Sequence, residues 1–514
     1  MRFFYYLIVL FFSLSACQQL GKTPFLCQIV GYDQHIELSW QAKAGTQYEV
    51  FESVAGQEHF LVKTDFPYYL DFLGTSKSRN YRIYELDDKG RHLVFEGQGS
   101  SRPFSDDELL DMVQRYTFRY FWEGAHPQSG MVLERFKDHL KGNIAASGAT
   151  GFGLMAIPVG IERGFISREE GAERVLKILN FLKKADRFHG VWPHWMHAET
   201  GQARPFDEKD DGGDLVESSH LLAGMEAVKS YFLEANEAEG DIRVLAQELI
   251  DGVEWDWYVK ESPYLRWHWS PNFKFEGSQR IEGYNQTLMT YMLAIGMKNE
   301  IGSAYFKEGW ANVNNNHFLN GREYYGMHLP LGNPNYGGTI INSIHSHFLI
   351  NPFGLQWEEI SFEEQVVNQA KINFAYCVDN PKSHSGYSKD CWGIGPADNP
   401  WGYGMHHPGP KDNGTIAPSA ALGIFPYTPE ESMRALKHFY RERGKELFGY
   451  YGFHDSFNDN AQWVADTYVG NSKAATLLMI ENYRSGLLWK LGGNSALIQN
   501  GLKSSGFRYT VEGS

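Results

Sequence analysis

One stretch of the chain combines aromatic side chains with a dense run of carboxylates. Hydrolysis of a glycosidic bond requires two carboxyl groups, a protonated acid for the leaving oxygen and a base or nucleophile for the other face of the sugar. Tryptophan supplies a flat apolar face on which a sugar ring can stack. The candidates in this stretch are, for catalysis, Asp210, Asp214 and Glu217 and, for substrate contact, Trp192, His194 and Trp195.

A purely structural interpretation competes for two of these carboxylates. Asp214 followed three residues later by Glu217 fits a helix N-cap and its third-position partner. Acidic side chains near a helix start are also favoured by the positive end of the helix dipole. Capping and chemistry both remain open at this point, and one residue could do both.

Tryptophans recur at every second residue in two later runs, Trp255-Asp256-Trp257 and Trp267-His268-Trp269. This alternation indicates a strand or an extended loop with its aromatic side chains on one face. A packed hairpin and a sugar-stacking wall account for the pattern equally well. We select the three residues of the second run, Trp267, His268 and Trp269, as candidate substrate contacts.

Two acidic residues lie just before the last long apolar segment, Ser472 to Leu491, which predicts a buried helix. Asp466 is a candidate base and Asp455 a candidate substrate contact. Trp392 and His406 lie in loops rich in tryptophan and are further candidate contacts. The histidine pairs of the chain have no acidic or cysteine partner spaced to complete a metal site, so we expect neither a metal nor another cofactor.

Composition narrows the class of ligand. The chain has 514 residues and a formal net charge of −15. This acidity argues against a nucleic-acid partner, because affinity for phosphate backbones rests mainly on Lys and Arg, and less strongly against polyanionic sugars. Phe, Trp and Tyr make up 15% of the residues. Together these figures favour a neutral glycan as the ligand.

The periodicity of the chain divides it into two regions. Residues 28–100 alternate apolar and polar side chains in short runs such as Ile36-Glu37-Leu38-Ser39-Trp40, which predicts a small all-β sandwich of the immunoglobulin or fibronectin type III kind. Residues 105–492 contain about a dozen predicted helices, with capping boxes at Ser105-Asp106-Asp107-Glu108 and at Ser167 with Glu170. Helix hairpins joined by long aromatic loops favour a mainly α fold, an α/α toroid.

The first 16 residues are interpreted as a targeting segment. Leu14-Ser15-Ala16-Cys17 resembles the lipobox of bacterial lipoproteins, which implies cleavage before Cys17 and lipidation of that residue. An ordinary secretory signal is the alternative. We expect a protein anchored by lipid alone, at an outer membrane if the host has one, with residues 17–27 as a linker and 493–514 as a tail. Cys377 and Cys391 could pair or remain free thiols.

Several runs of the helical region resemble the glycoamylase-like domain of glycoside hydrolase family 144, the bacterial β-1,2-glucanases and sophorose-releasing hydrolases. The matching runs include Thr150-Gly151-Phe152-Gly153, Asp211-Gly212-Gly213-Asp214, Trp267-His268-Trp269-Ser270-Pro271 and Ile480-Glu481-Asn482-Tyr483-Arg484. The resemblance covers residues 105–491. It implies an (α/α)6 barrel, a neutral β-glucan substrate and an inverting mechanism without metal. It places Asp210 and Asp214 on family active-site carboxylates and the 455–466 loop at the substrate cleft.

The chain departs from the family pattern at two places. Gly283-Tyr284-Asn285-Gln286 has Gln where the family has a catalytic-site Glu, and Gln286 can neither donate nor accept a proton in catalysis at neutral pH. Residues 470–475 also differ from the family sequence. If residues 282–286 are helical, Glu282 shares a face with Gln286 and could supply the missing carboxylate. Gln286 itself is kept as a substrate contact.

Three functions are compatible with these observations. The first is a hydrolase of a neutral β-linked glucan or oligosaccharide, with an acid among Glu282, Asp214 and Glu217 and a base from Asp210 or Asp466. The second is a carbohydrate-binding lipoprotein that retains the aromatic cleft without turnover, as the Gln286 substitution suggests. The third is a polysaccharide lyase, because α/α toroids host that chemistry too.

Overall fold

The computed structural model describes residues 26–510, except 138–141, 260–262, 298–300 and 315–316. The chain divides into two compact units, residues 1–109 and 110–514. The signal segment, Cys17 and most of the predicted linker lie outside the described residues. In the described part of the chain, no helix is both long and apolar enough to cross a membrane.

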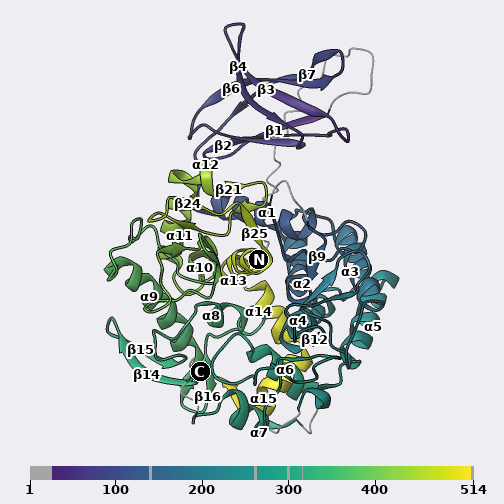
Figure 1. The fold of residues 1–514 in the computed structure, drawn as a ribbon, viewed down its shortest axis with the longest axis vertical. Helices are drawn as coiled ribbons and strands as arrows, with labels where there is room; N and C mark the ends of the chain where they lie inside the picture. Colours follow the sequence, from purple (N-terminus) through teal and green to yellow (C-terminus); the bar gives the residue numbers. More distant parts are fainter. Residues whose placement is uncertain (1–25, 138–141, 260–262, 298–300, 315–316, 511–514) are drawn as a thin grey trace, which may run out of the picture. The chain divides into compact units, whose positions relative to one another are not determined.

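The first unit is a sandwich of two antiparallel sheets, in agreement with the predicted β region (Figure 1). One sheet has the order β1-β2-β5 and the other β4-β3-β6-β7. Their inward-facing side chains, among them Leu38, Trp40, Val50 and Ile83, form one buried cluster. The strands are β1 (Cys27–Gly31), β2 (His35–Trp40), β3 (Gln47–Val54), β4 (Gln57–Thr64), β5 (Tyr68–Phe72), β6 (Ser78–Asp87) and β7 (Gly90–Ser100).

The second unit is a ring of helices in two layers (Figure 1). Helices close to the ring centre alternate along the chain with helices outside them. The inner layer contains α2 (Ser147–Glu162), α4 (Leu215–Tyr231), α6 (Leu288–Met297), α8 (Ile341–His345), α10 (Pro418–Leu422) and α13 (Gly470–Arg484). The outer layer contains α1 (Asp106–Trp122), α3 (Arg168–Leu182), α5 (Glu237–Asp251), α7 (Ser303–Tyr305), η2 (Phe306–Trp310), α9 (Phe362–Asp379) and α11 (Pro429–Lys437).

Residue type separates the two layers. Helix α2 is buried over nearly its whole length and is rich in Gly and Ala, whereas α3 buries one stripe that includes Val175, Leu179 and Leu182. A helix that is apolar on all sides belongs in an interior, and an amphipathic helix belongs at the surface of a core. Gly151 of α2 and Gly224 of α4 face each other's backbones so closely that a Cβ atom on either would collide.

Predicted local features are confirmed where they depend on neighbouring residues. Ser167 and Glu170 form a complete capping box at the start of α3. A long-range contact also forms: Glu481 of α13 is buried and accepts two hydrogen bonds from Arg163, at 2.7 and 2.8 Å. The predicted helix over 472–491 is instead two helices, α13 and α14 (Leu487–Asn494), because Gly486 adopts a left-handed conformation with φ of 66°.

The prediction of a C-terminal tail at 493–514 is wrong for its described part. Helix α15 (Ala496–Ser504) packs against α6, and β26 (Phe507–Tyr509) pairs with β16 (Leu355–Trp357). Gly296 and Gly501 permit the close approach of the two helices, since a Cβ atom on Gly501 would collide with the backbone of Met292. The helical unit therefore extends through residue 510.

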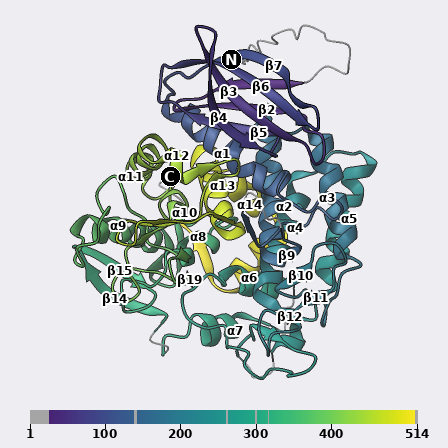
Figure 2. The ribbon, with the colours of Figure 1, turned by 45° about the horizontal axis from the view of Figure 1, so that its top comes forward.

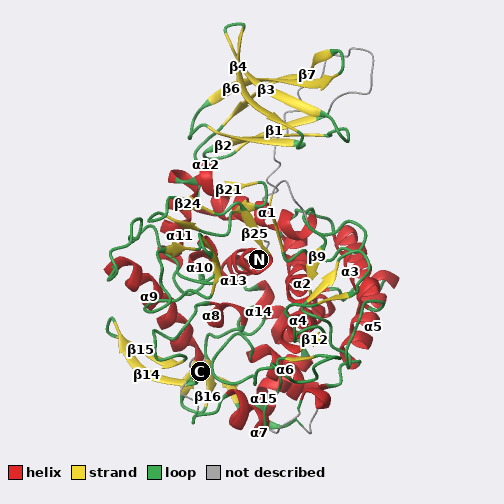
Figure 3. Cartoon of the chain, viewed as in Figure 1, coloured by secondary structure: helices red, strands yellow, loops and turns green. Residues whose placement is uncertain are grey.

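Loops and short strands join the helices, and several of them lie beside the N-termini of α2 and α4 (Figures 2 and 3). One small sheet has the order β11-β10-β9, made of β11 (Ala203–Arg204), β10 (Trp195–His197) and β9 (Ile144–Ala146). A second pairs β12 (Gly213–Asp214) with β13 (His268–Trp269). These pairings bring three separate parts of the chain to one place.

Candidate active site

The hydrogen bonds at the start of α4 show which of Asp214 and Glu217 caps the helix. Oδ1 of Asp214 accepts hydrogen bonds from the backbone N–H groups of Val216 and Glu217, both at 2.9 Å, so Asp214 is the N-cap. Glu217 does not complete the capping box. Its Oε2 accepts instead from the backbone N–H of Gly148 in the first turn of α2, at 3.0 Å. Glu217 is thus held between two inner helices.

His194 links this N-cap to the neighbouring loop. Its Nδ1 lies 2.9 Å from Oδ2 of Asp214, which is fully buried. The imidazole stacks on Phe206 with the ring centroids 4.1 Å apart. Burial opposes the charge on His194, but the carboxylates of Glu217 and Asp214 outweigh it and raise the pKa of the imidazole to about 10. Asp214 therefore positions an imidazolium beside Glu217.

Two carboxyl groups of this site hold protons unusually well. Burial, reinforced by the neighbouring Asp214 carboxylate, raises the pKa of Asp210 to about 7. Burial also raises the pKa of Glu217 to about 7, against the opposing charge of His194. Carboxyl groups with such raised pKa values are typical of acid and base catalysis at neutral pH.

Three buried polar atoms at this site have no hydrogen-bond partner within the described residues: Asp210 Oδ1, His268 Nε2 and Trp195 Nε1. Nδ1 of His268 lies 3.6 Å from Oδ2 of Asp210, which places two of the three in one cluster. Buried polar groups are nearly always satisfied, so unsatisfied ones call for a ligand or water. Together they present an acceptor, an imidazole and an indole donor, a set that suits hydroxyl groups.

Two predicted aromatic contacts are wrong. Trp192 and Trp392 are fully buried, and their Nε1 atoms donate to the backbone oxygens of Leu182 and Glu431. Both therefore belong to the core, because a ligand cannot reach their rings.

The run from Trp255 is a short 3-10 helix, η1 (Trp255–Tyr258), rather than a strand. Trp257 is 42% exposed and stacks on His189. Trp269 is mostly buried and packs edge-on against Trp257, whereas Trp267 is half-buried. Most of these aromatic side chains therefore pack against one another rather than forming an exposed wall on which a sugar could stack.

A second group of carboxylates lies at the start of α13. Asp455 is buried and accepts hydrogen bonds from Ser472 Oγ at 2.5 Å and from the backbone N–H of Asp398 at 2.7 Å. Asp398 in turn accepts from Arg135 and Thr467, at 2.7 and 2.6 Å. Burial, reinforced by Asp398, raises the pKa of Asp455 to about 6. Asp455 thus fixes a loop, with each of its carboxylate oxygens accepting one hydrogen bond from the protein.

Asp466 and His406, predicted as a catalytic base and a substrate contact, both interact with other residues of the protein. Asp466 is 71% exposed at its side chain and pairs with Lys137 at 2.8 Å. This exposed ion pair does not join the cluster of carboxyl groups at α4, so the assignment of Asp466 as the catalytic base is not supported. His406 is buried between the backbone oxygen of Lys411 and the side chain of Asn399, which stabilises the loop following Trp392.

The hypothesis that Glu282 and Gln286 share a helical face is wrong. Residues 282–286 are not helical, since Gly283 has a φ of 82° and α6 begins only at Leu288. Both side chains are half-buried.

Sequence reasoning missed Gly148, Arg135 and Asp398. Gly148 acts through its backbone, and its Cβ position is filled by the Glu217 carboxylate, so only the fold reveals it. Arg135 and Asp398 lie in the short strands β8 (Arg135–Lys137) and β18 (Ala397–Asn399), and no sequence motif marks their pairing over such a separation.

No group of three or more His, Cys, Asp or Glu side chains suited to a metal ion occurs among the residues that the structure describes. Cys377 and Cys391 are both buried free thiols, which decides between the two interpretations of this pair.

Comparison with known proteins gives consistent matches. Residues 278–495 match the Glycoamylase family model, described as "Putative glucoamylase". The exo β-1,2-glucooligosaccharide sophorohydrolase (non-reducing end) of Parabacteroides distasonis is 39% identical, over 94% of this chain and 70% of its own length.

Two solved structures are also similar. A β-1,2-glucanase from Parabacteroides distasonis has a TM-score of 0.87 and 37% identity, over 96% of this chain and 74% of that one. An endo-β-1,2-glucanase from Chitinophaga pinensis, in complex with sophorotriose and glucose, has a TM-score of 0.76 and 41% identity, over 79% of this chain and 99% of that one. The helical unit thus has the helical barrel fold of these hydrolases.

Proposed function

Since the chain belongs to the glycoamylase-like family of glycoside hydrolases, we propose that it hydrolyses β-1,2-linked glucan chains or oligosaccharides. The observation that carries this proposal is the cluster at α4, where two carboxyl groups with raised pKa values lie among unsatisfied polar atoms. The 39% identical relative is named for β-1,2-glucooligosaccharides, which supports the linkage. The helical unit is interpreted as an (α/α)6 barrel.

The contacts favour a particular division of roles. Asp210 has an oxygen without a donor, which favours its protonated form, and it is proposed as the general acid. Glu217 accepts a backbone N–H and lies near an imidazolium, both of which stabilise its anion, and it is proposed as the general base. We propose that this pair supports an inverting, metal-independent reaction, with water attacking on the face opposite the leaving oxygen. Neither Glu282 nor Asp466 takes part.

Variants of the two residues test the roles. Asp210→Asn and Glu217→Gln should each lower kcat on β-1,2-glucooligosaccharides by about 100-fold or more. With an aryl β-sophoroside, whose leaving group needs no acid, Asp210→Asn should regain most of its activity and Glu217→Gln should not. Azide should restore turnover only to Glu217→Gln. The opposite pattern would reverse the assignment.

The same assay tests the function. Reducing sugars should appear from β-1,2-glucan, and proton NMR of the first products should show the inverted anomer. Treatment with a chelator should leave the rate unchanged. Binding without products, equal in wild type and Asp210→Asn, would instead support a carbohydrate-binding protein in which Gln286 replaces the family Glu. Unsaturated uronate products from acidic polymers would indicate a lyase.

The location of the enzyme is a separate proposal. The lipobox-like Leu14-Ser15-Ala16-Cys17 supports attachment through a lipid on Cys17, at an outer membrane where the host has one. The β-sandwich is interpreted as a fibronectin type III-like module without chemistry of its own. Metabolic labelling with a fatty-acid analogue, lost in Cys17→Ser, tests the anchor.

A further inference from the structure

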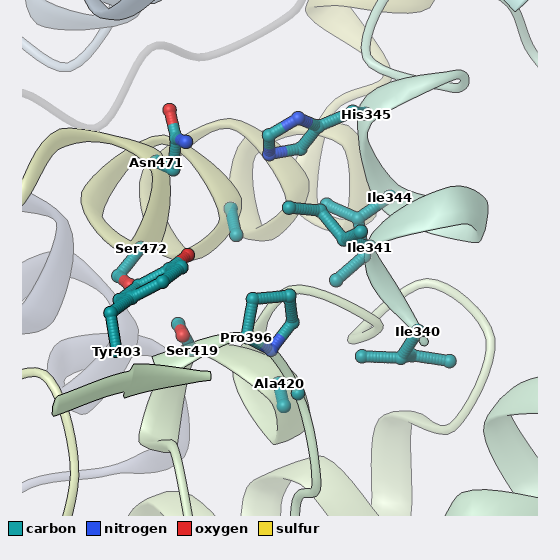
Figure 4. A pocket seen from close by; sticks show the side chains of 12 residues that line it. Ile340, Ile341, Ile344, His345, Pro396, Tyr403, Ser419, Ala420, Asn471 and Ser472 are labelled. Carbon is teal, nitrogen blue, oxygen red and sulfur yellow. The ribbon is translucent and has the colours of Figure 1, made fainter. Parts of the chain in front are cut away.

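A pocket between three inner helices contains a buried histidine that the proposed mechanism does not use. His345, at the end of α8, is 3% exposed, and within the described residues neither of its ring nitrogens has a hydrogen-bond partner. Figure 4 shows its ring and the Asn471 amide at the same end of this pocket. We call the space the His345 pocket; its other polar side chains are Tyr403, Ser419 and Ser472.

The pocket is neutral. Its remaining lining consists of Ile, Ala, Pro and Gly residues, and no Lys, Arg, Asp or Glu contributes. Burial and the neighbouring His220 lower the pKa of His345 well below its usual value, so the ring is uncharged at neutral pH. A neutral imidazole presents one donor and one acceptor. The hydroxyl group offers the same pair, whereas an anion or a cation would find no counter-charge.

The pocket lies below the proposed catalytic site. The His345 ring contacts Phe152 of α2 and His220 of α4, with ring centroids 5.1 and 5.5 Å apart. Phe152 is four residues after Gly148, and His220 is three residues after Glu217, so both lie about one turn, or roughly 5.4 Å, deeper in the ring. Solvent reaches the lining at Tyr403, which is 44% exposed, and at the half-buried Pro396, Asn471 and Ser472.

We propose that the His345 pocket binds an uncharged hydroxyl-bearing group of the sugar chain, with His345 both donating to it and accepting from it. This inference rests on the proposed function, because it assigns part of that substrate to a place. His345 is then a specificity-determining residue, and the two unsatisfied nitrogens are a cost to the unliganded protein that binding removes. Asn471, beside it at the start of α13, supplies a second neutral donor and acceptor.

The test separates binding from folding. In His345→Leu, affinity for β-1,2-glucooligosaccharides, measured by calorimetry on Asp210→Asn enzyme to prevent turnover, should fall roughly tenfold or more. The Tm of the unliganded protein should stay the same or rise, since a buried unsatisfied group is removed. His345→Asn, which keeps a donor and an acceptor, should recover part of the affinity.

His347→Gln is the matched control, because His347 is buried in the turn after α8 and does not line the His345 pocket. Its Nδ1 lies 3.0 Å from the backbone oxygen of Ile350, and its Nε2 has no partner within the described residues. His347→Gln should lower Tm and leave affinity unchanged. Unchanged affinity in His345→Leu would overturn the proposal. A fall in both Tm and affinity that His345→Asn does not reverse would overturn it too. Either result would leave the proposed hydrolase function intact. If the Asp210→Asn enzyme binds no β-1,2-glucooligosaccharide and the wild type cleaves none, both proposals fail.

Discussion

Three acidic residues within positions 210–217 have different roles because their hydrogen-bond partners differ. Asp214 is occupied by two backbone N–H groups and an imidazolium. Glu217 accepts from another helix, and Asp210 retains an unsatisfied oxygen. Residue type alone therefore does not separate capping from chemistry; the hydrogen bonds do.

Asp210 should make stability depend on pH. Its folded pKa of about 7 exceeds its unfolded value, so between about pH 4 and 7 the folded protein binds the extra proton and stability falls as pH rises. Asp210→Asn should remove that loss, raising stability above pH 7 by about 1–3 kcal/mol and leaving it nearly unchanged at pH 4. Thermal melts at both pH values measure this. A uniform change at both pH values, or the same pattern in the exposed control Asp466→Asn, would contradict it.

At the scale of elements, the starts of the inner helices create the site. Asp214 caps α4, Gly148 lies in the first turn of α2 and Ser472 lies in the first turn of α13. Helix N-termini present unpaired N–H groups, which carboxylates satisfy. The paired strands β12 and β13 then bring His268 beside the Asp214 loop.

The non-helical backbone before α6 decides the role of Glu282. With Gly283 in a positive-φ conformation, Glu282 does not share a helical face with Gln286. Glu282→Gln should therefore keep kcat within about twofold of wild type, an effect far below that of losing an acid or base catalyst. Steady-state kinetics on β-1,2-glucooligosaccharides measure it. A loss of 100-fold, matching Asp210→Asn, would restore Glu282 as a catalytic candidate.

At the scale of the molecule, the helical ring is closed by its C-terminal helices as well as by the alternating layers. Helix α15 packs on α6 through two glycines, and β26 adds a strand beside β16. Such a contact tolerates no added side chain, because interiors are close-packed. Helix α15 is accordingly part of the core of the helical unit.

Gly501→Leu should destabilise the helical unit by about 3 kcal/mol or more, since its Cβ collides with the backbone of Met292. Gly493→Ala is the control, because no atom lies within 4 Å of its Cβ position. Chemical denaturation of both variants measures the difference. Equal stability of the two variants would show that the α6–α15 contact is dispensable.

The sequence alone determined the features that depend on neighbours along the chain. These are the sandwich strands, the apolar helix near Ser472, the capping box at Ser167 and the run of acidic residues at 207–217. Their periodicities and caps are short-range, so a window of residues contains the whole signal. The resemblance to a hydrolase family was likewise visible in short runs.

The tertiary structure decided everything that joins distant residues. In the folded chain Glu217 accepts a hydrogen bond from Gly148, and Trp192 and Trp392 lie in the core. Asp466 is exposed, and the ring nitrogens of His345 have no hydrogen-bond partner within the described residues. Burial and hydrogen-bond partners depend on how the helices pack, and packing is a property of the whole ring. The pKa values of the carboxyl groups follow from that burial, so the sequence could list the candidate residues but could not assign their roles.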